Sequence, residues 1–171
     1  MTTAHPRPDL AAYNLAARMT QAELEVPFAD LYGHRLSALK LDGEAGRIAF
    51  TLALLSPELD TLAKDLTPTD PRETFLLALA KGSITGLTPP DSLARAIAPA
   101  FTGHAVEGQL ADLAAENRTG EAILAAIDQI ENGVQGDLDG VTDGLALLRK
   151  IGLDRAARRT ALELLLLERR G

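Results

Sequence analysis

Residues 136–171 read GDLDGVTDGLALLRKIGLDRAARRTALELLLLERRG, which predicts two helices separated by a glycine. In the first helix the apolar residues recur three or four positions apart, as one face of a helix requires. They are Leu138, Val141, Leu145 and Leu148. Asp137 can cap this helix, and Gly152 stands where a left-handed C-cap would end it. The stretch is therefore expected to form an αα-hairpin whose second helix starts at Leu153 and Asp154.

The second helix is apolar around most of its circumference. Its expected core stripe is Leu153, Ala157, Ala161, Leu164 and Leu165. The run 164–167 covers about 300° at 100° per residue, so a single flat neighbour cannot bury it. Two flanking helices or a partner must cover it, and we assign Leu166 and Leu167 to a partner-binding face. We expect the hairpin to be the closing layer of a helical stack.

The upstream sequence predicts further helices from apolar spacing, capping residues and prolines in first turns. Their expected ranges are 10–18, 28–41, 45–55, 57–66, 71–81, 91–97, 105–116 and 122–130. Pro99 is expected to bend or end one helix, and Asn132 with Gly133 to end another. The short connections favour antiparallel neighbours. We expect an all-α fold of about nine helices, in antiparallel αα-hairpins that form a helical bundle or a short α-solenoid.

The length of 171 residues fits a single domain over 1–171, with a core large enough to need no metal or disulfide. Residues 1–8, with Pro6 and Pro8, are expected to be a flexible lead-in. The sequence GSITGLTPP, residues 82–90, is the longest loop-like stretch, and we take it as a candidate boundary between two subdomains.

Composition excludes several classes of function. The net charge is −7, with 18 acidic and 10 basic residues before position 137, so nucleic acid is not an expected partner. The absence of cysteine excludes thiolate metal sites and cysteine nucleophiles, but leaves the redox compartment open. No secretory leader and no run of about 18 apolar residues is present, so we expect a cytoplasmic protein without a membrane span.

Residues 26–59 carry Gly33, Leu36, Ala45, Phe50 and Pro57 at about the spacing of a tetratricopeptide unit. This fifth of the chain resembles that family, although Leu52 occupies a position that is usually Ala and no tryptophan opens the unit. The Ala-, Leu- and Arg-rich hairpins are also similar to uncharacterised helical-repeat proteins of GC-rich bacteria. The tetratricopeptide resemblance implies a scaffold that binds a protein or peptide in a groove.

The histidines do not form a cluster in the sequence. His104 and Glu107 could supply two metal ligands, fewer than the three or four that zinc commonly needs, and are better explained as turn and helix-start residues. His34 beside Arg35 and Tyr32 could begin an acid–base site, but no nucleophile follows by spacing. Tyr32 is instead expected to be a core ring with its hydroxyl at the surface.

The acidic run 137–144 is superficially similar to a calcium loop. An EF-hand register starting at Asp137 places Val141 where an oxygen ligand is required, and a register starting at Asp139 places Lys150 where a glutamate is required. These acids are better explained as favourable charges at a helix N-terminus. We therefore expect no metal, no cofactor and no catalytic residue.

Five basic residues flank the turn of the terminal hairpin: Arg149, Lys150, Arg155, Arg158 and Arg159. We assign Arg155, Arg158 and Arg159 to the partner-binding surface together with the exposed leucines, although a solvated helix face is an alternative explanation. The sequence thus favours a non-catalytic helical scaffold that binds a protein or peptide, or itself, through an apolar groove or strip. The alternatives are an enzyme with a site formed from scattered polar residues, or a structural fragment of a larger helical-repeat protein.

Overall fold

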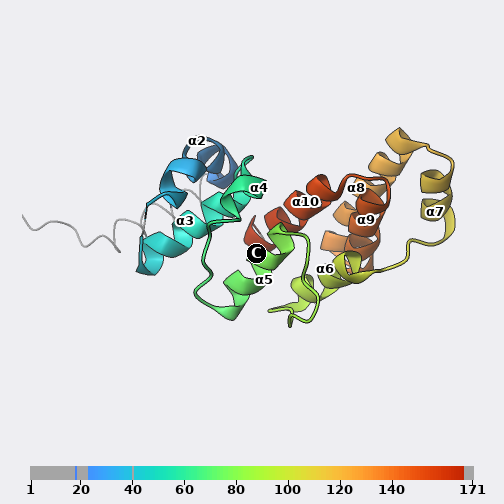
Figure 1. Ribbon diagram of the computed structural model, residues 1–171. Helices are drawn as coiled ribbons and strands as arrows, with labels where there is room; N and C mark the ends of the chain where they lie inside the picture. Colours follow the sequence, from blue (N-terminus) through green and yellow to red (C-terminus); the bar gives the residue numbers. More distant parts are fainter. Residues whose placement is uncertain (1–17, 19–22, 40, 168–171) are drawn as a thin grey trace, which may run out of the picture. The chain divides into compact units, whose positions relative to one another are not determined.

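The computed structural model describes residues 18, 23–39 and 41–167, and this part of the chain is all-helical (Figure 1). It contains nine helices and no strand within those residues, which confirms the predicted fold class. The lead-in 1–8 and nearly all of the helix predicted at 10–18 lie outside the described residues. No described helix combines the length and the apolar character that crossing a bilayer requires.

The chain divides into two compact units, Met1–Thr67 (unit 1) and Pro68–Gly171 (unit 2). The division follows residue 67, whereas the predicted boundary at 82–90 lies inside unit 2. In that stretch the side chain of Ile84 is only 2% exposed, and the Leu87 amide donates to the Ile84 carbonyl at 3.1 Å. The loop is therefore anchored to the core of unit 2.

Unit 1 consists of α2 (Glu25–Ser37), α3 (Gly43–Leu55) and the single turn α4 (Leu59–Leu62). Helix α3 packs against both α2 and α4. Its C-terminal half supplies most of the core, and Leu52, Ala53, Leu54 and Leu55 are all buried. Helix α4 is shorter than the predicted 57–66, because turns replace helix on both of its sides.

The buried face of α2 differs from the predicted one. Apolar spacing over the predicted helix 28–41 would place Leu31, Tyr32 and Leu39 in the core, but all three are exposed, and the centroid of the Tyr32 ring lies 4.7 Å from that of the Phe28 ring. The buried residues are instead the small Ala29 and Gly33. A Cβ on Gly33 would lie 3.0 Å from the Leu52 carbonyl oxygen, so α2 and α3 are close enough to leave no room for a leucine there.

Unit 2 consists of six helices. They are α5 (Pro71–Ala80), α6 (Ser92–Thr102), α7 (Gly108–Ala115), α8 (Thr119–Gln135), α9 (Asp139–Lys150) and α10 (Asp154–Leu167). Of these, α5 and α6 start at aspartate caps, whereas the predicted cap at Asp137 is wrong because the N-cap residue of α9 is Leu138. The Asp70 carboxylate accepts from the Glu73 amide at 2.7 Å, and that of Asp91 from the Ala94 amide at 2.8 Å. These capping contacts satisfy amides that have no partner within the helix.

Helix α9 is the centre of unit 2, packing against α6, α7, α8 and α10. Val141, Leu145 and Leu147 have no exposed side-chain surface. The terminal hairpin is therefore not the closing layer that the sequence suggested, because its first helix is covered from several sides. Of the predicted apolar stripe, Val141, Leu145 and Leu148 are buried in α9 while Leu138 is half-buried just before it, and Ala146 and Leu147 widen the buried face.

Helix α8 continues to Gln135, past the predicted stop at Asn132 and Gly133. A Cβ on Gly133 would lie 2.5 Å from the Val141 amide nitrogen, and a Cβ on Gly144 would lie 2.6 Å from the Ala126 carbonyl oxygen. These glycines serve close packing between α8 and α9 rather than helix termination. Apolar spacing over the predicted helix 122–130 would place Ile123, Ile127 and Ile130 on one inward face, but Ile127 is 46% exposed.

Helix α6 likewise continues through Pro99 to Thr102. Proline lacks an amide hydrogen and pushes against the preceding turn, which disturbs the hydrogen bonds of that turn. The hydroxyl of Thr142, a buried residue of α9, donates to the Ala96 carbonyl within that turn. Packing against α9 and this bond maintain a helix that the local sequence disfavours.

Candidate functional site

The turn between α9 and α10 fixes the orientation of the helix that carries most of the site. Gly152 has φ of +86°, its amide donates to the Arg149 carbonyl at 3.0 Å, and the Leu153 amide donates to the Leu148 carbonyl at 2.9 Å. This is the left-handed C-cap predicted from the sequence, in its Schellman form. Helix α10 then starts at Asp154 with one face against α9.

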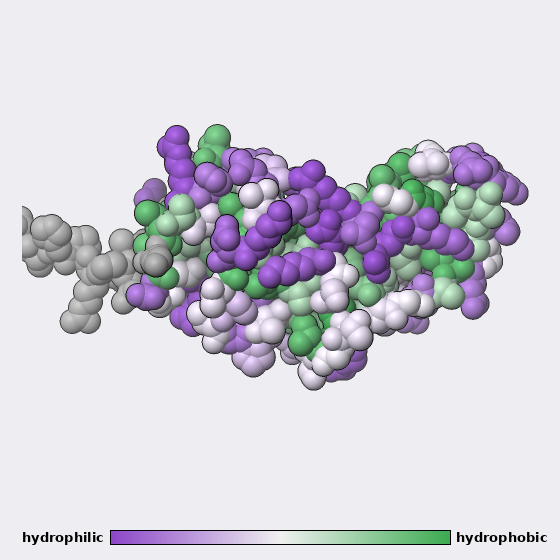
Figure 2. All heavy atoms as spheres, in the orientation of Figure 1, coloured by the Kyte–Doolittle hydropathy of each residue, from purple (hydrophilic) through white to green (hydrophobic). Residues whose placement is uncertain are grey.

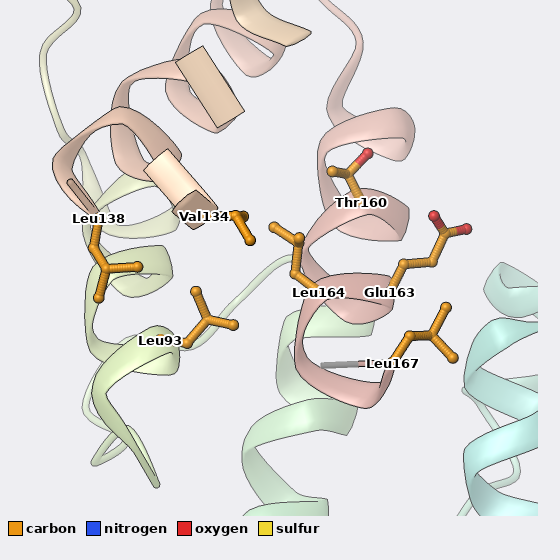
Figure 3. A pocket seen from close by; sticks show the side chains of 7 residues that line it. All are labelled: Leu93, Val134, Leu138, Thr160, Glu163, Leu164 and Leu167. Carbon is orange, nitrogen blue, oxygen red and sulfur yellow. The ribbon is translucent and has the colours of Figure 1, made fainter. Parts of the chain in front are cut away.

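A pocket of about 370 Å³ lies among α6, α8 and α10 (Figure 3). Its lining residues are Leu93, Val134, Leu138, Thr160, Glu163, Leu164 and Leu167. From α10, Leu164 points toward Val134. Leu93 and Leu138 lie on the side of the pocket opposite α10. All of these residues belong to unit 2, so the pocket is formed by one compact unit.

The interior of the pocket is dominated by aliphatic side chains. Five of its seven lining residues are leucine or valine, and the polar residues Thr160 and Glu163 both come from α10. The Glu163 carboxylate accepts a hydrogen bond from Arg159 Nε at 2.9 Å. A pocket of this size and character suits an apolar group, with the polar residues available to orient it.

Three predicted residues contribute differently to this site. Leu167 lines the pocket, Leu166 is half-buried but is not among the lining residues, and Arg159 is the ion-pair partner of the lining Glu163. The other lining residues were not assigned to a partner-binding face from sequence. Val134 was missed because the helix was expected to end before it at Gly133, and Leu138 because it was assigned to the apolar stripe of the following helix.

Arg158 lies in a polar cluster at the helix ends of unit 2. Its Nε donates to Asp154 Oδ2 at 2.8 Å, and its Nη1 donates to the Ala80 carbonyl at the end of α5. Its side chain is only 14% exposed, and its contacts stabilise the packing of α10 against α5. Arg155, in contrast, is exposed on the same helix.

Arg149 completes this cluster from α9. Its Nε donates to Asp154 Oδ1 at 2.8 Å, its Nη1 donates to the Ala100 carbonyl at 2.7 Å, and its guanidinium lies 4.8 Å from the Phe101 ring centroid. Burial of Asp154 would raise its pKa, but the hydrogen bonds from Arg149 and Arg158 outweigh this and hold that pKa below its ordinary value. The cluster, which we call the Asp154 clamp, therefore links the start of α10 and the end of α9 to the C-terminal parts of α5 and α6.

The histidine and calcium-like patterns have structural explanations. His104 Nε2 lies 2.7 Å from Asp143 Oδ1, a partner that the sequence did not suggest, while His34 is exposed on α2. Asp137 Oδ1 accepts from the Asp139 amide at 3.1 Å, as in a local turn. Within residues 23–39 and 41–167, no three His, Cys, Asp or Glu residues converge in a way that could hold a metal ion.

A second, more open hollow of about 560 Å³ lies where residues 68–74 meet 86–88. Its polar residues include Thr69 and Asp70. Thr69 donates through both its amide and its hydroxyl to Glu73, at 2.7 and 2.8 Å, and Asp70 caps α5. Because these groups already serve the start of a helix, the apolar pocket is the stronger candidate site.

Comparison with known proteins does not supply a relative from which a function could be transferred. No protein-family model, no curated protein and no solved structure matches this chain.

Proposed function

We propose that unit 2 is a non-catalytic binding module that captures an apolar segment of another protein or peptide in the pocket among α6, α8 and α10. The observation that carries this proposal is the aliphatic lining of the pocket next to exposed apolar residues on α8. Grooves of this kind between helices commonly receive one face of an amphipathic helix.

Exposure of the surrounding side chains supports the proposal. Val134 lines the pocket and is 49% exposed, and Leu124 on the same helix is 68% exposed. Figure 2 shows apolar surface around the end of unit 2 where Figure 1 labels α7 and α8. Large exposed apolar side chains gathered on one helix beside a pocket are typical of interaction sites.

The test is binding of a fluorescent amphipathic peptide of about 18 residues, with leucines at heptad spacing, measured by anisotropy with the full chain. Val134→Asp places a charge in the pocket wall at a half-exposed position, so folding should be retained. We expect it to weaken binding by about tenfold or more, as truncation of a central contact does.

Leu31→Asp is the matched control, because Leu31 is a 71% exposed apolar residue of unit 1. It should leave the affinity unchanged. Equal effects of the two substitutions, or no binding of any heptad peptide, would overturn the proposed function.

We also propose a cytoplasmic location and a helical-repeat character for residues 26–59. The pairing of α2 with α3 supports the second of these, because a helix pair is the unit of such repeats. Imaging of a fluorescent fusion tests the first.

A further inference from the structure

Helix α8 carries an exposed apolar seam that runs into the pocket. Leu124, Ile127, Glu131 and Val134 follow the alternating three- and four-residue spacing of a heptad, within an arc of about 80° at 100° per residue. Val134, the last residue of this seam, also lines the pocket, together with Leu138 at the start of α9. Seam and pocket therefore form one continuous surface, which we call the α8 seam.

The α8 seam is acidic as well as apolar. Residues 119–135 contain three acidic side chains, Glu121, Asp128 and Glu131, and no basic one. Arg118, just before the helix, donates to Glu121 at 2.8 Å and lowers the pKa of that carboxylate. Among the residues that the structure describes, none forms an ion pair with Asp128 or Glu131, and both are exposed.

Of the three acidic residues of α8, Glu131 is the one that lies within the row of apolar side chains. It occupies a seam position between Ile127 and Val134, where an apolar residue would ordinarily stand. An occupant of the seam must cover this carboxylate, and covering an unpaired charge is costly unless a cation comes with the partner. The occupant should therefore present Lys or Arg opposite Glu131.

The α8 helix of a second copy of this chain does not meet that requirement. Pairing α8 with its own copy would bring acidic side chains from both helices together without a basic residue from either. Like charges placed across an interface are unfavourable, and the net charge of −7 adds to the repulsion. The charge pattern thus favours a different protein over self-association.

We infer that the α8 seam binds a basic amphipathic helix of a partner protein, which lies along α8 and places one apolar side chain in the pocket. This inference rests on the proposed function and adds the chemistry of the partner. The distance from Leu124 to Val134 is about 15 Å along the helix axis, which corresponds to about three helical turns of the partner.

The test compares three peptides of about 18 residues with the full chain. The first carries leucines at heptad spacing with lysines beside them, the second has glutamates in place of the lysines, and the third is a scramble of the first. We expect the lysine peptide to bind at least about tenfold more tightly than either of the others. Its affinity should fall as NaCl is raised from about 50 to about 500 mM.

Glu131→Lys should reverse the preference, lowering the affinity for the lysine peptide and raising that for the glutamate peptide. Asp65→Lys in unit 1 makes the same change in net charge at an exposed position and is the matched control, which should leave the preference unchanged. This pair of variants separates a specific contact at the α8 seam from general attraction to an acidic protein.

The outcomes distinguish this inference from the proposed function. If the lysine and glutamate peptides bind equally and Val134→Asp weakens both, the apolar site stands and the basic partner is refuted. If the scramble binds as well as the lysine peptide, or if Asp65→Lys acts like Glu131→Lys, the inference is also wrong. If no peptide binds, the inference and the proposed function fail together.

Discussion

Gly133 of α8 and Val141 of α9 approach so closely that a Cβ on Gly133 would lie 2.5 Å from the Val141 amide nitrogen. No real side chain fits at that distance from a backbone atom, so one of the two helices would have to move. The same contact sets where Val134, the next residue of α8, stands in the pocket wall. The geometry of the candidate site thus depends on a glycine in its supporting layer.

We expect Gly133→Ala to destabilise unit 2 by about 1–3 kcal/mol, because the added methyl group forces α8 away from α9. Urea unfolding followed by circular dichroism measures the change. Gly120→Ala, in the first turn of the same helix, is the matched control, because a Cβ there meets nothing within 4 Å. It should be neutral or stabilise by up to about 1 kcal/mol, since alanine is the better helix former. A neutral Gly133→Ala would contradict the close packing.

The Asp154 clamp should make stability depend on pH in a defined range. The pKa of Asp154 is lowered in the folded state, so the carboxylate contributes stability above its unfolded value of about 3.8. That contribution is lost as the pH falls through the folded pKa. Asp154→Asn should therefore be less stable than the parent at pH 7, with a difference that shrinks at about pH 3. A difference of constant size in urea unfolding at the two pH values would contradict this explanation.

The leucines of α10 should separate into core and site residues. Leu162 and Leu165 are 0% and 4% exposed, so replacing either with alanine should cost about 2–5 kcal/mol in urea unfolding. Leu167→Ala should weaken binding of the heptad peptide, because Leu167 lines the pocket. Leu166→Ala is its control, since Leu166 is also half-buried but is outside the lining. Equal binding losses for these two variants would show that the binding surface differs from the pocket.

Thr142 should stabilise the proline-containing helix α6 through its bond to the Ala96 carbonyl. Thr142→Val keeps the shape of the side chain but removes the donor. We expect a loss of about 0.5–1.5 kcal/mol in urea unfolding, the typical net contribution of one hydrogen bond. An unchanged free energy of unfolding would show that this bond does not stabilise α6.

The local sequence was sufficient for features that depend on a few neighbouring residues. The helix start at residue 71, after Asp70, and the break at Gly152 were both predicted, because each requires only a few residues beside the turn. The all-helical class followed from apolar spacing for the same reason. Of the site, this reasoning identified Leu167 and the apolar character of α10.

Tertiary packing decided what the local signals could not. Gly133 and Pro99 are residue types that usually end helices, yet α8 and α6 continue through them, because contacts with α9 stabilise the longer helix. Leu31 and Ile127 were expected inside but are exposed, because closely packed helices bury small residues such as Gly33 and Ala126 at their contacts. The sequence by itself determined where most helices start and which apolar side chains are available to form a core. Which apolar side chains remain at the surface, and so where a partner can bind, depended on the distances between helices, which are set by contacts far apart in the chain.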